Sequence, residues 1–182
     1  SDGTFLLLSP TIVVVTNIDP EHLDFYGDME HVKAAYLDFI NRVPFYGRAV
    51  LCLDSVNIRA LLPHVRKRFV TYGVSPDAEL TARNLTVSGL MTHCEVWHGE
   101  ELLGDLRLNL PGRHYALNAL AVVAVSRELG IPFTQVQEAL ESFAGIQRRF
   151  EVKGEAAGVL VIDDYGHHPE EVRATLRAAR EG

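Results

Sequence analysis

The sequence predicts an α/β fold built on a mostly parallel sheet, and three observations lead to that prediction. Short apolar, β-branched runs alternate with segments of helical period through the first part of the chain. Three segments of alternating polarity follow between turn residues, which is typical of a small antiparallel meander. Hydrophobic residues make up 47% of the 182 residues and charged residues 23%, proportions typical of a folded globular protein.

The first part of the chain is expected to supply three parallel strands and two helices. The run 11–16 is apolar on both faces, which is typical of a strand buried within a parallel sheet. The next expected elements are a helix over 29–43, a strand over 48–53, a helix near 56–65 and a strand near 68–72. In the first helix the apolar side chains recur at helical spacing and form one side, namely Val32, Tyr36, Phe39 and Ile40.

The character of the sequence changes after Gly73, where apolar and polar residues begin to alternate. Strands of the meander are expected over 80–89, 91–98 and 101–110. Two helices are then expected, over 113–129 and 133–143. Gly130 ends the first of them, because glycine readily adopts the left-handed conformation that follows a helix.

The composition excludes several classes of function. The formal net charge of −7 argues against a general nucleic-acid-binding protein, which would carry a basic stripe. Two cysteines, Cys52 and Cys94, are too few for a disulfide framework or a zinc site. No apolar run approaches the length of a membrane span, and no signal peptide is visible. We therefore expect no nucleic-acid partner, no membrane association and a reducing, cytoplasmic setting.

Both ends of the chain are expected to lie inside a larger protein. The sequence starts with Ser1-Asp2-Gly3 rather than an initiator Met and closes on Arg180-Glu181-Gly182 within an expected helix. No glycine is followed by lysine, so a phosphate-binding loop of the G-x-x-x-x-G-K-[ST] type is missing. If the protein uses a nucleoside triphosphate, its main phosphate cradle is expected outside these 182 residues.

The polar stretch Asp19–Asp24 lies just past the carboxyl end of the first expected strand. In open α/β sheets, ligands bind beyond the carboxyl ends of the strands. Carboxylates together with an imidazole, here His22, can hold a hard cation such as magnesium or manganese beside a phosphate. The alternative interpretation is a solvated loop in which Asp19 caps a helical turn.

The stretch LPGRHYALN, residues 110–118, begins the longest expected helix. His114 and Asn118 are four residues apart and therefore share a face of that helix. We expect Gly112 to let a ligand approach the backbone near the helix N-terminus, which favours anionic groups. The alternative is that Asn118 is a hydrogen-bonded amide in the protein interior.

Two arginines precede an aromatic residue in the stretch Arg148–Glu151. Either arginine could bind a phosphate through two parallel hydrogen bonds. The alternative is an ordinary pair of surface charges, which would contribute little to stability.

The stretch VIDDYGHHPEE, residues 161–171, combines two acids, a tyrosine and two histidines at the end of an expected buried strand over 159–162. Pro169 then opens a closing helix. Function concentrates in such strand-end loops. One alternative is a capped turn with exposed histidines. Another is a hydrolase-type metal site, for which only Asp19, His22 and Asp24 offer further ligands.

Five stretches in this order resemble the Mur ligase family of peptidoglycan synthesis. They are SDGTFLLLSPTIVVVTNIDPEHLDFYG, VPFYGRAVLCLD, LPGRHYALNALA, GIQRRFEVKGE and VIDDYGHHPEEV. The resemblance covers essentially the whole chain and implies a complete protein of three domains, which bind a UDP-sugar, bind ATP and form a Rossmann-like C-terminal unit. It implies that residues 1–147 belong to the central ATP-binding domain, without its phosphate-loop portion, and that residues 148–182 begin the C-terminal domain.

The resemblance also implies roles for eight side chains. His22 resembles the magnesium ligand of the family. The positions that face ATP correspond here to His114, Asn118, Arg149 and Asp164. The residues expected to be catalytic, near the substrate carboxylate and the incoming amino acid, are Tyr165, His167 and His168. Because they belong to a different domain from the ATP cradle, the site is expected to be complete only when the domains close.

The sequence departs from the family pattern at two positions. Tyr115 stands where the family motif G-x-H-N has asparagine, so a contact through that amide is not expected. Tyr36 stands where several related ligases carry a carbamylated lysine, so no carbamate is expected.

The implied activity is ATP-dependent amide-bond formation through an acyl phosphate, with magnesium as the metal. The stretch NIDPEHLDFYG is most similar to members that join L-alanine to UDP-N-acetylmuramate, so these are the expected substrates. Two alternatives stay open: a ligase that attaches murein tripeptide to the same sugar nucleotide, and a non-catalytic α/β binding module. Without the phosphate loop and the sugar-nucleotide domain, the chain alone is expected to be inactive.

Overall fold

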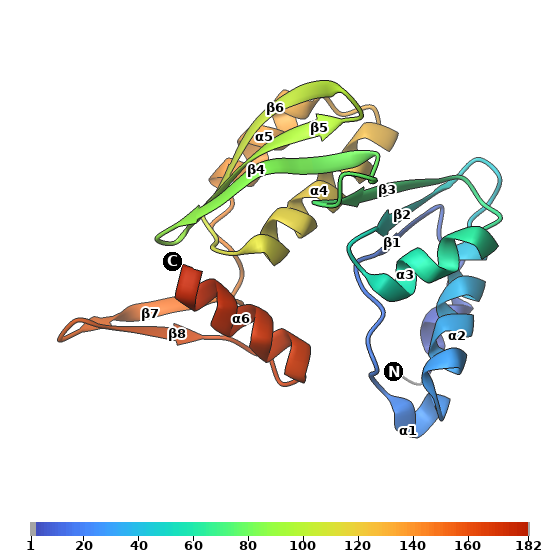
Figure 1. The fold of residues 1–182 in the computed structure, drawn as a ribbon, viewed down its shortest axis with the longest axis horizontal. Helices are drawn as coiled ribbons and strands as arrows, with labels where there is room; N and C mark the ends of the chain where they lie inside the picture. The colour runs from blue at the N-terminus through green and yellow to red at the C-terminus, as the bar shows by residue number, and fades with distance from the viewer. Residues whose placement is uncertain (1–2, 182) are drawn as a thin grey trace.

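The computed structural model describes residues 3–181 and contains a six-stranded sheet, a two-stranded sheet and the helices around them (Figure 1). The elements in chain order are η1 (Thr4–Leu7), β1 (Ile12–Val15), α1 (Leu23–Tyr26), α2 (Met29–Asn41), β2 (Arg48–Cys52), α3 (Val56–Leu61), η2 (Leu62–His64), β3 (Phe69–Gly73), β4 (Leu80–Ser88), β5 (Met91–His98), β6 (Glu101–Leu108), α4 (Arg113–Glu128), α5 (Phe133–Ser142), β7 (Glu151–Ala156), β8 (Val159–Asp163) and α6 (Pro169–Glu181). This architecture confirms the α/β fold class predicted from the sequence.

The large sheet changes from parallel to antiparallel at β4. Strands β1 to β4 are parallel neighbours, whereas β4, β5 and β6 are antiparallel neighbours. The start of β4 is held beside β3 by two reciprocal hydrogen bonds. The Thr71 N–H donates to Glu79 Oε1 at 3.2 Å, and the Glu79 N–H donates to Thr71 Oγ1 at 3.0 Å. The predicted meander is therefore a continuation of the parallel sheet.

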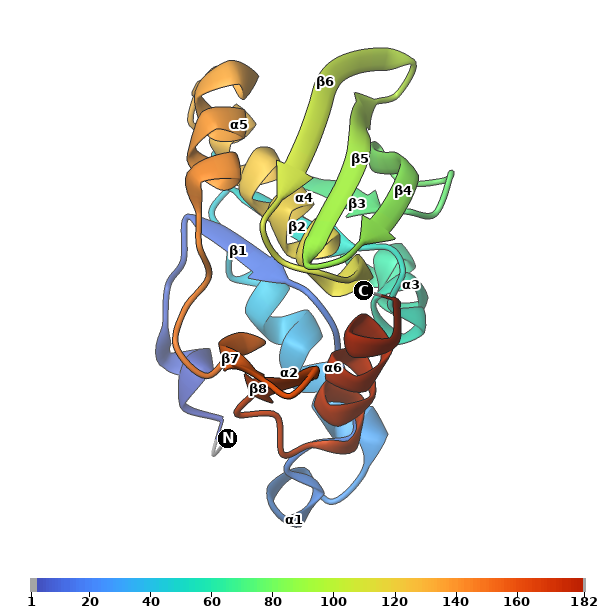
Figure 2. The same ribbon diagram turned by 90° about the vertical axis from the view of Figure 1, so that its left-hand side faces the viewer.

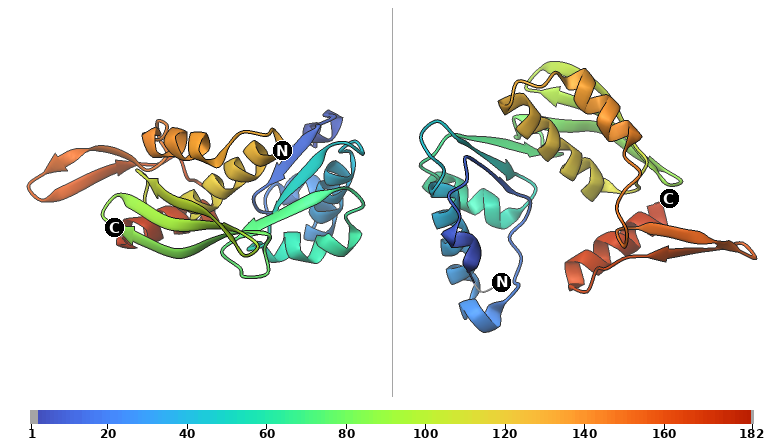
Figure 3. Two further views of the ribbon diagram at one scale, coloured as in Figure 1. Left: turned by 90° about the horizontal axis from the view of Figure 1, so that it is seen from above. Right: turned by 180° about the vertical axis from the view of Figure 1, so that it is seen from behind.

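Helices cover both faces of the parallel part of the sheet. Helices α2 and α3 lie on one face and α4 on the other, while α5 lies beside β6 (Figure 3). The helix expected near 56–65 divides into α3 and η2, because Pro63 has no N–H with which to continue the α-helical ladder.

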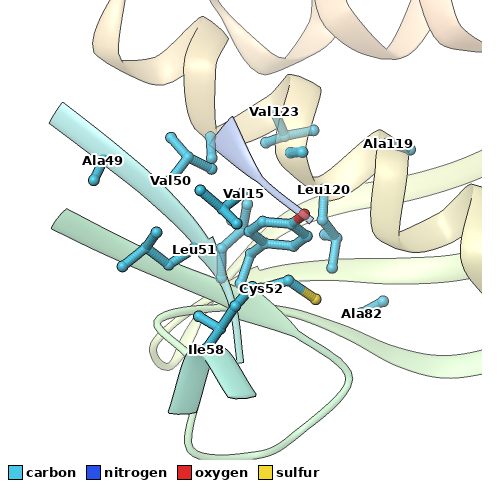
Figure 4. Close-up of a cluster of buried hydrophobic side chains, with 14 of the residues drawn as sticks. Val15, Ala49, Val50, Leu51, Cys52, Ile58, Ala82, Ala119, Leu120 and Val123 are labelled. Atoms are coloured by element: carbon cyan, nitrogen blue, oxygen red, sulfur yellow. The ribbon is translucent and has the colours of Figure 1, made fainter. Parts of the chain in front are cut away.

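The core lies between β2 and the helices on either side of it. Every residue from Ala49 to Cys52 is buried, as expected for a central parallel strand. Figure 4 shows Leu120 and Val123 of α4 meeting this strand together with Val15 of β1. Small residues such as Ala119 let α4 approach the sheet closely. Each apolar side chain buried here contributes about 1.5–3 kcal/mol to the free energy of unfolding.

Strand β1 departs from the expectation that both its faces are buried. Val13 and Val15 are buried, but Val14 is 40% exposed. Within residues 3–181, β2 is the only strand that pairs with β1, so β1 is an edge strand. An edge strand receives cover from fewer neighbours than a central one, which leaves one face partly open.

The strand expected over 159–162 forms as β8, but the prediction that it is buried is wrong. Val159, Leu160 and Val161 are 63%, 42% and 51% exposed. Successive residues of a strand face opposite sides, so both faces of β8 contact solvent. The reason is that β8 pairs with β7 alone, in a two-stranded ribbon that extends away from the large sheet (Figure 1). Across the part of the chain that the structure describes, no helix is both long and apolar enough to cross a membrane.

Candidate functional site

A cavity of about 660 Å³ lies beyond the carboxyl end of β1, between the start of α4, the end of α5 and the start of α6. Figure 2 shows α6 on the same side of the molecule as α1 and the segment that leaves β1. The polar side chains that line the cavity are Thr16, Asn17, Asp19, Glu21, Tyr72, His114, Tyr115, Asn118, Arg149, Asp164, Glu170, Glu171 and Thr175. This position agrees with the rule that open α/β sheets bind ligands at the carboxyl ends of their strands.

The structure brings together all four side chains that were expected to face a nucleotide. His114, Asn118, Arg149 and Asp164 line this one cavity, although they come from α4, the α5–β7 connection and the end of β8. Their roles toward a ligand stay predictions, but their convergence does not follow from their spacing in the sequence.

Asn118 is exposed to the cavity, and its amide makes no hydrogen bond to any residue that the structure describes. The alternative of a hydrogen-bonded interior amide is therefore wrong. The reason is that positions 116, 119 and 120 lie on the buried side of α4, whereas position 118 lies on its exposed side. A side-chain amide whose donor and acceptor are both unused can form hydrogen bonds with the edge of a ring that carries polar atoms.

His114 and Tyr115 form the wall of the cavity at the first turn of α4, with ring centroids 4.2 Å apart. Burial lowers the pKa of His114, and the nearby Asp164 carboxylate opposes that change. Burial raises the pKa of Tyr115 to about 12, with Asp164 adding to the effect and Arg149 opposing it. Both side chains are therefore neutral near pH 7.

The space beside Gly112 is occupied by the protein itself, which corrects the expectation that a ligand approaches the backbone there. A Cβ atom at Gly112 would lie 2.9 Å from the Cβ atom of Ala178 in α6. The residue also has a φ of 113°, which side-chain-bearing residues rarely adopt. Glycine at this position therefore lets α6 dock against the start of α4.

Arg149 occupies a constrained turn between α5 and β7. Its neighbours Arg148 and Phe150 both have left-handed backbone angles, with φ of 57° and 50°. The Asp164 carboxylate fixes this turn, since its Oδ2 accepts the Phe150 N–H at 2.8 Å and its Oδ1 accepts the Gly166 N–H at 2.7 Å. Asp164 therefore has a structural role in addition to its position in the cavity.

Glu171 connects this turn to the loop that carries His167 and His168, called the histidine loop below. Its Oε2 accepts the backbone N–H groups of His167 and His168 at 3.1 and 3.2 Å, and its Oε1 lies 3.6 Å from Arg149 Nη1. These backbone hydrogen bonds are the largest cause that holds the pKa of Glu171 below its usual value. Arg148 lies over the Tyr165 ring, 4.7 Å from its centroid.

The three side chains expected to be catalytic lie beside the cavity rather than in its lining. Tyr165 and His167 are exposed, and their rings are 5.3 Å apart. His168 is less exposed, and its Nδ1 lies 3.4 Å from Glu21 Oε1 on the loop after β1. The histidine loop therefore meets the loop that carries His22. The alternative of a capped turn with exposed histidines explains the hydrogen bonds from Glu171 to the backbone of this loop. It does not explain the contact between His168 and Glu21.

His22 is the only one of the eight expected site residues that precedes α4. It has a left-handed φ of 56°, and its Nε2 lies 4.0 Å from Glu21 Oε2. Asn57 Nδ2 donates to the Ile18 carbonyl at 2.6 Å and anchors the start of this loop to α3. Asp19 is not a helix cap, because His22 precedes α1 and no side chain caps that helix.

No cluster of three or more His, Cys, Asp or Glu side chains in residues 3–181 is arranged to hold a metal ion. The hydrolase-type metal site is therefore not supported. The pKa of Asp19 is raised above its usual value, mainly because the carboxyl group is partly buried. The nearby carboxylates of Glu170 and Glu21 add to this effect. The carboxylates of Asp19, Glu21 and Glu170 therefore lie near each other at one side of the cavity, but they are not arranged as the ligands of a metal ion.

Several lining residues were missed by the sequence analysis. Thr16 and Asn17 are the first two residues after β1, and the strand-end rule applied to each polar residue would have found them. Glu170 and Thr175 lie on α6, and Phe143 and Ile146 lie near the end of α5. No local signal identifies these four, because only the folded chain brings α6 and the end of α5 to the same cavity.

Comparisons with known proteins place this geometry in context. Residues 3–126 match the model of the Mur ligase middle domain, and residues 148–182 match that of the Mur ligase glutamate ligase domain. A curated relative from Syntrophobacter fumaroxidans, UDP-N-acetylmuramate--L-alanine ligase, is 58% identical over 178 residues, which are 97% of this chain and 38% of that protein. The chain therefore spans about two-fifths of the length of the relative that it matches.

Two solved structures from Thermotoga maritima are also similar. The UDP-N-acetylmuramate-alanine ligase MurC superposes with a TM-score of 0.81 at 31% identity, over 98% of this chain and 40% of that one. The MurF ligase in complex with ADP superposes with a TM-score of 0.79 at 23% identity, over 96% of this chain and 40% of that one. At 23% identity, the similarity to the MurF ligase shows a shared fold and nothing more.

Proposed function

The chain belongs to the Mur ligase family, and from this premise we propose that it is part of an ATP-dependent ligase that joins L-alanine to UDP-N-acetylmuramate. The observation that carries the proposal is the convergence of His114, Asn118, Arg149 and Asp164 on one cavity. Residues from both matched segments contribute to it. The 58% identity to a curated alanine ligase supports the choice of substrates.

We divide the chain into residues 1–147 of the central ATP-binding domain and residues 148–182 at the start of the C-terminal domain. The left-handed turn around Arg149 is a suitable junction, because it directs β7 and β8 away from the large sheet. A cavity lined from both sides of this junction changes its shape when the two parts move.

The cavity fits the adenosine part of ATP in size and chemistry. Three apolar side chains in its lining are well exposed, namely Val122 at 44%, Phe143 at 45% and Ile146 at 62%. A flat purine ring would cover them, and the free Asn118 amide beside them can pair with its edge. We propose Arg149 as the cation that binds a phosphate, with His114 as a neutral hydrogen-bonding group, because both line the cavity.

The proposed reaction proceeds in two steps. The carboxylate of UDP-N-acetylmuramate attacks the γ-phosphorus of ATP, which gives an acyl phosphate and ADP. The amine of L-alanine then attacks the acyl carbon, the C–N bond forms, and inorganic phosphate leaves. Arg149 would stabilise the charge that develops on the transferred group. Tyr165, His167 and His168 would orient the substrate carboxylate and the incoming amine.

Magnesium would supply charge neutralisation and Lewis acidity at the transferred phosphoryl group. We propose His22 as its protein ligand. Magnesium usually keeps several waters and takes oxygens from substrate phosphates, so it does not need a cluster of protein side chains. The half-exposed His22 imidazole, on the loop that Asn57 anchors, is compatible with this coordination.

We place the reaction in peptidoglycan synthesis in the cytoplasm, where ATP and sugar nucleotides are found, and through cell-wall biogenesis it would affect cell shape and division. The partners are then the two small-molecule substrates. The deciding assay uses the complete ligase, meaning a polypeptide of full family length that carries this chain. ATP and UDP-N-acetylmuramate are supplied with either L-alanine or murein tripeptide, and ligated product and ADP are measured.

Faster product formation with L-alanine is the expected result. Preference for the tripeptide would replace the proposed substrate. Absence of ADP release with either amine, in a protein that is folded by circular dichroism, would favour a non-catalytic binding module.

A further inference from the structure

Asp54 lies at the carboxyl end of β2, immediately after Leu53, and its side chain is only 10% exposed. It does not line the cavity described above. A carboxylate with so little access to water is costly unless other groups compensate its charge. The partners of Asp54 therefore indicate what this residue does.

Three donors from two other segments converge on the Asp54 carboxylate. Oδ2 accepts the Val74 N–H at 3.1 Å and Oδ1 accepts the Ser75 N–H at 3.0 Å, which holds the loop after β3. Oδ2 also accepts from Arg113 Nη2 at 2.9 Å, which holds the first residue of α4. A Cβ atom at Gly73 would lie 2.6 Å from Asp54 Oδ1, so glycine is needed where the loop passes this carboxylate.

The start of α4 has a second attachment on its other side. Thr92 Oγ1 of β5 accepts the Gly112 N–H at 2.9 Å and donates to the Leu110 carbonyl at 2.8 Å. Gly112 itself provides no side-chain cap for the helix. Thr92 and the packing of α6 hold the main chain at Gly112, just before the helix, whereas the Asp54–Arg113 contact holds the first residue of the helix and fixes the direction of its first turn.

We infer that Asp54, acting through Arg113, is a positioning residue that directs the first turn of α4 toward the nucleotide cavity. This inference rests on the proposed function, because His114 and Asn118 lie on that turn and the next one and are proposed to bind ATP. Arg113 is half exposed and does not line the cavity, so its guanidinium serves the helix rather than the ligand.

The test measures ADP binding by calorimetry and the KM and kcat for ATP in the complete ligase. Asp54→Asn and Arg113→Ala should each weaken ADP binding, by roughly fivefold to twentyfold and threefold to tenfold, because a small misplacement of binding groups is costly. The KM for ATP should rise in parallel while kcat changes less. Arg113→Lys should restore part of the loss, and the double variant should be little weaker than Asp54→Asn alone.

Arg59→Ala is the matched control. Arg59 also holds the loop after β3, through Ser75 Oγ at 3.0 Å and Asp77 Oδ2 at 3.1 Å, and within residues 3–181 no hydrogen bond or ion pair joins it to α4. This variant should leave ADP affinity unchanged. If it weakens binding as much as Arg113→Ala does, general loosening of the edge of the sheet explains the effect and the inference is wrong.

A second readout does not depend on any ligand. Amide hydrogen exchange over residues 114–120 should become faster in Asp54→Asn and Arg113→Ala than in Arg59→Ala. Unchanged exchange and unchanged ADP affinity in Arg113→Ala would overturn the inference, even if Asp54→Asn fails to fold. Weaker binding in Arg113→Ala but not in a folded Asp54→Asn would show that Arg113 contacts the nucleotide directly. Failure of the unaltered ligase to bind ADP would instead refute the proposed function.

Discussion

At the scale of single residues, His22 combines a functional proposal with a backbone conformation that few side chains adopt. Its φ of 56° is tolerated by asparagine but costs alanine about 1 kcal/mol. The imidazole itself is half exposed and has little packing to lose. A substitution at this position therefore tests the backbone and the metal ligand at the same time, and the two effects need separate variants.

His22→Ala in the complete ligase should reduce turnover at limiting magnesium by at least about tenfold, and more typically about a hundredfold, because a fixed ligand beside the transferred phosphoryl group is lost. High magnesium should restore part of the rate. Steady-state rates across a magnesium titration measure this effect. His22→Asn keeps the backbone angle and controls for folding, so its melting temperature should match the original. Unaltered kinetics in both variants would remove His22 from the site.

At the scale of elements, the docking of α6 on α4 depends on one glycine. Gly112→Ala would place a Cβ atom 2.9 Å from the Cβ atom of Ala178, in a backbone conformation with a φ of 113°. The strain and the overlap together should destabilise the contact by about 2–3 kcal/mol. We expect a lower melting temperature and faster proteolysis at the α5–β7 connection, which limited proteolysis with mass spectrometry measures.

Gly158→Ala separates strain from overlap. Gly158 has a φ of 76°, but no atom lies within 4 Å of the position of its Cβ, so this variant adds backbone strain without a clash. It should lower the melting temperature less and leave the α5–β7 connection protected. Equal effects of the two substitutions would show that the Gly112–Ala178 contact does not hold α6 in place.

At the scale of the whole molecule, we predict that the 182-residue chain alone does not ligate L-alanine to UDP-N-acetylmuramate. It contains no phosphate-binding loop of the G-K-[ST] type, and it spans 38% of the curated relative's length. The measurement is ATP- and alanine-dependent product formation by the purified chain, with the complete ligase as the positive control. Product above background would contradict the prediction.

The sequence by itself determined the elements and much of their order. Helix α4 and strands β4 to β6 follow the predicted boundaries closely, because periodicity, Gly130 and the turn residues act locally and need no tertiary contact. The stretches that hold the eight expected site residues were singled out because several chemical groups lie within a few positions of each other, whereas the roles of the eight residues came from the family resemblance. Such local groups can be recognised before any fold is known.

Only the tertiary structure decided which of these groups meet. Arg149 and Asp164 reach the cavity of Asn118 because Asp164 fixes the turn around Arg149 and α6 docks at Gly112. The exposure of β8 and of Val14 could not be predicted, because an apolar strand has the same sequence whether or not other strands cover it. The role of Asp54 was equally hidden, since its three donors come from segments about 20 and 59 residues away. Burial and long-range hydrogen bonding are properties of the assembled fold, whereas periodicity is a property of the chain.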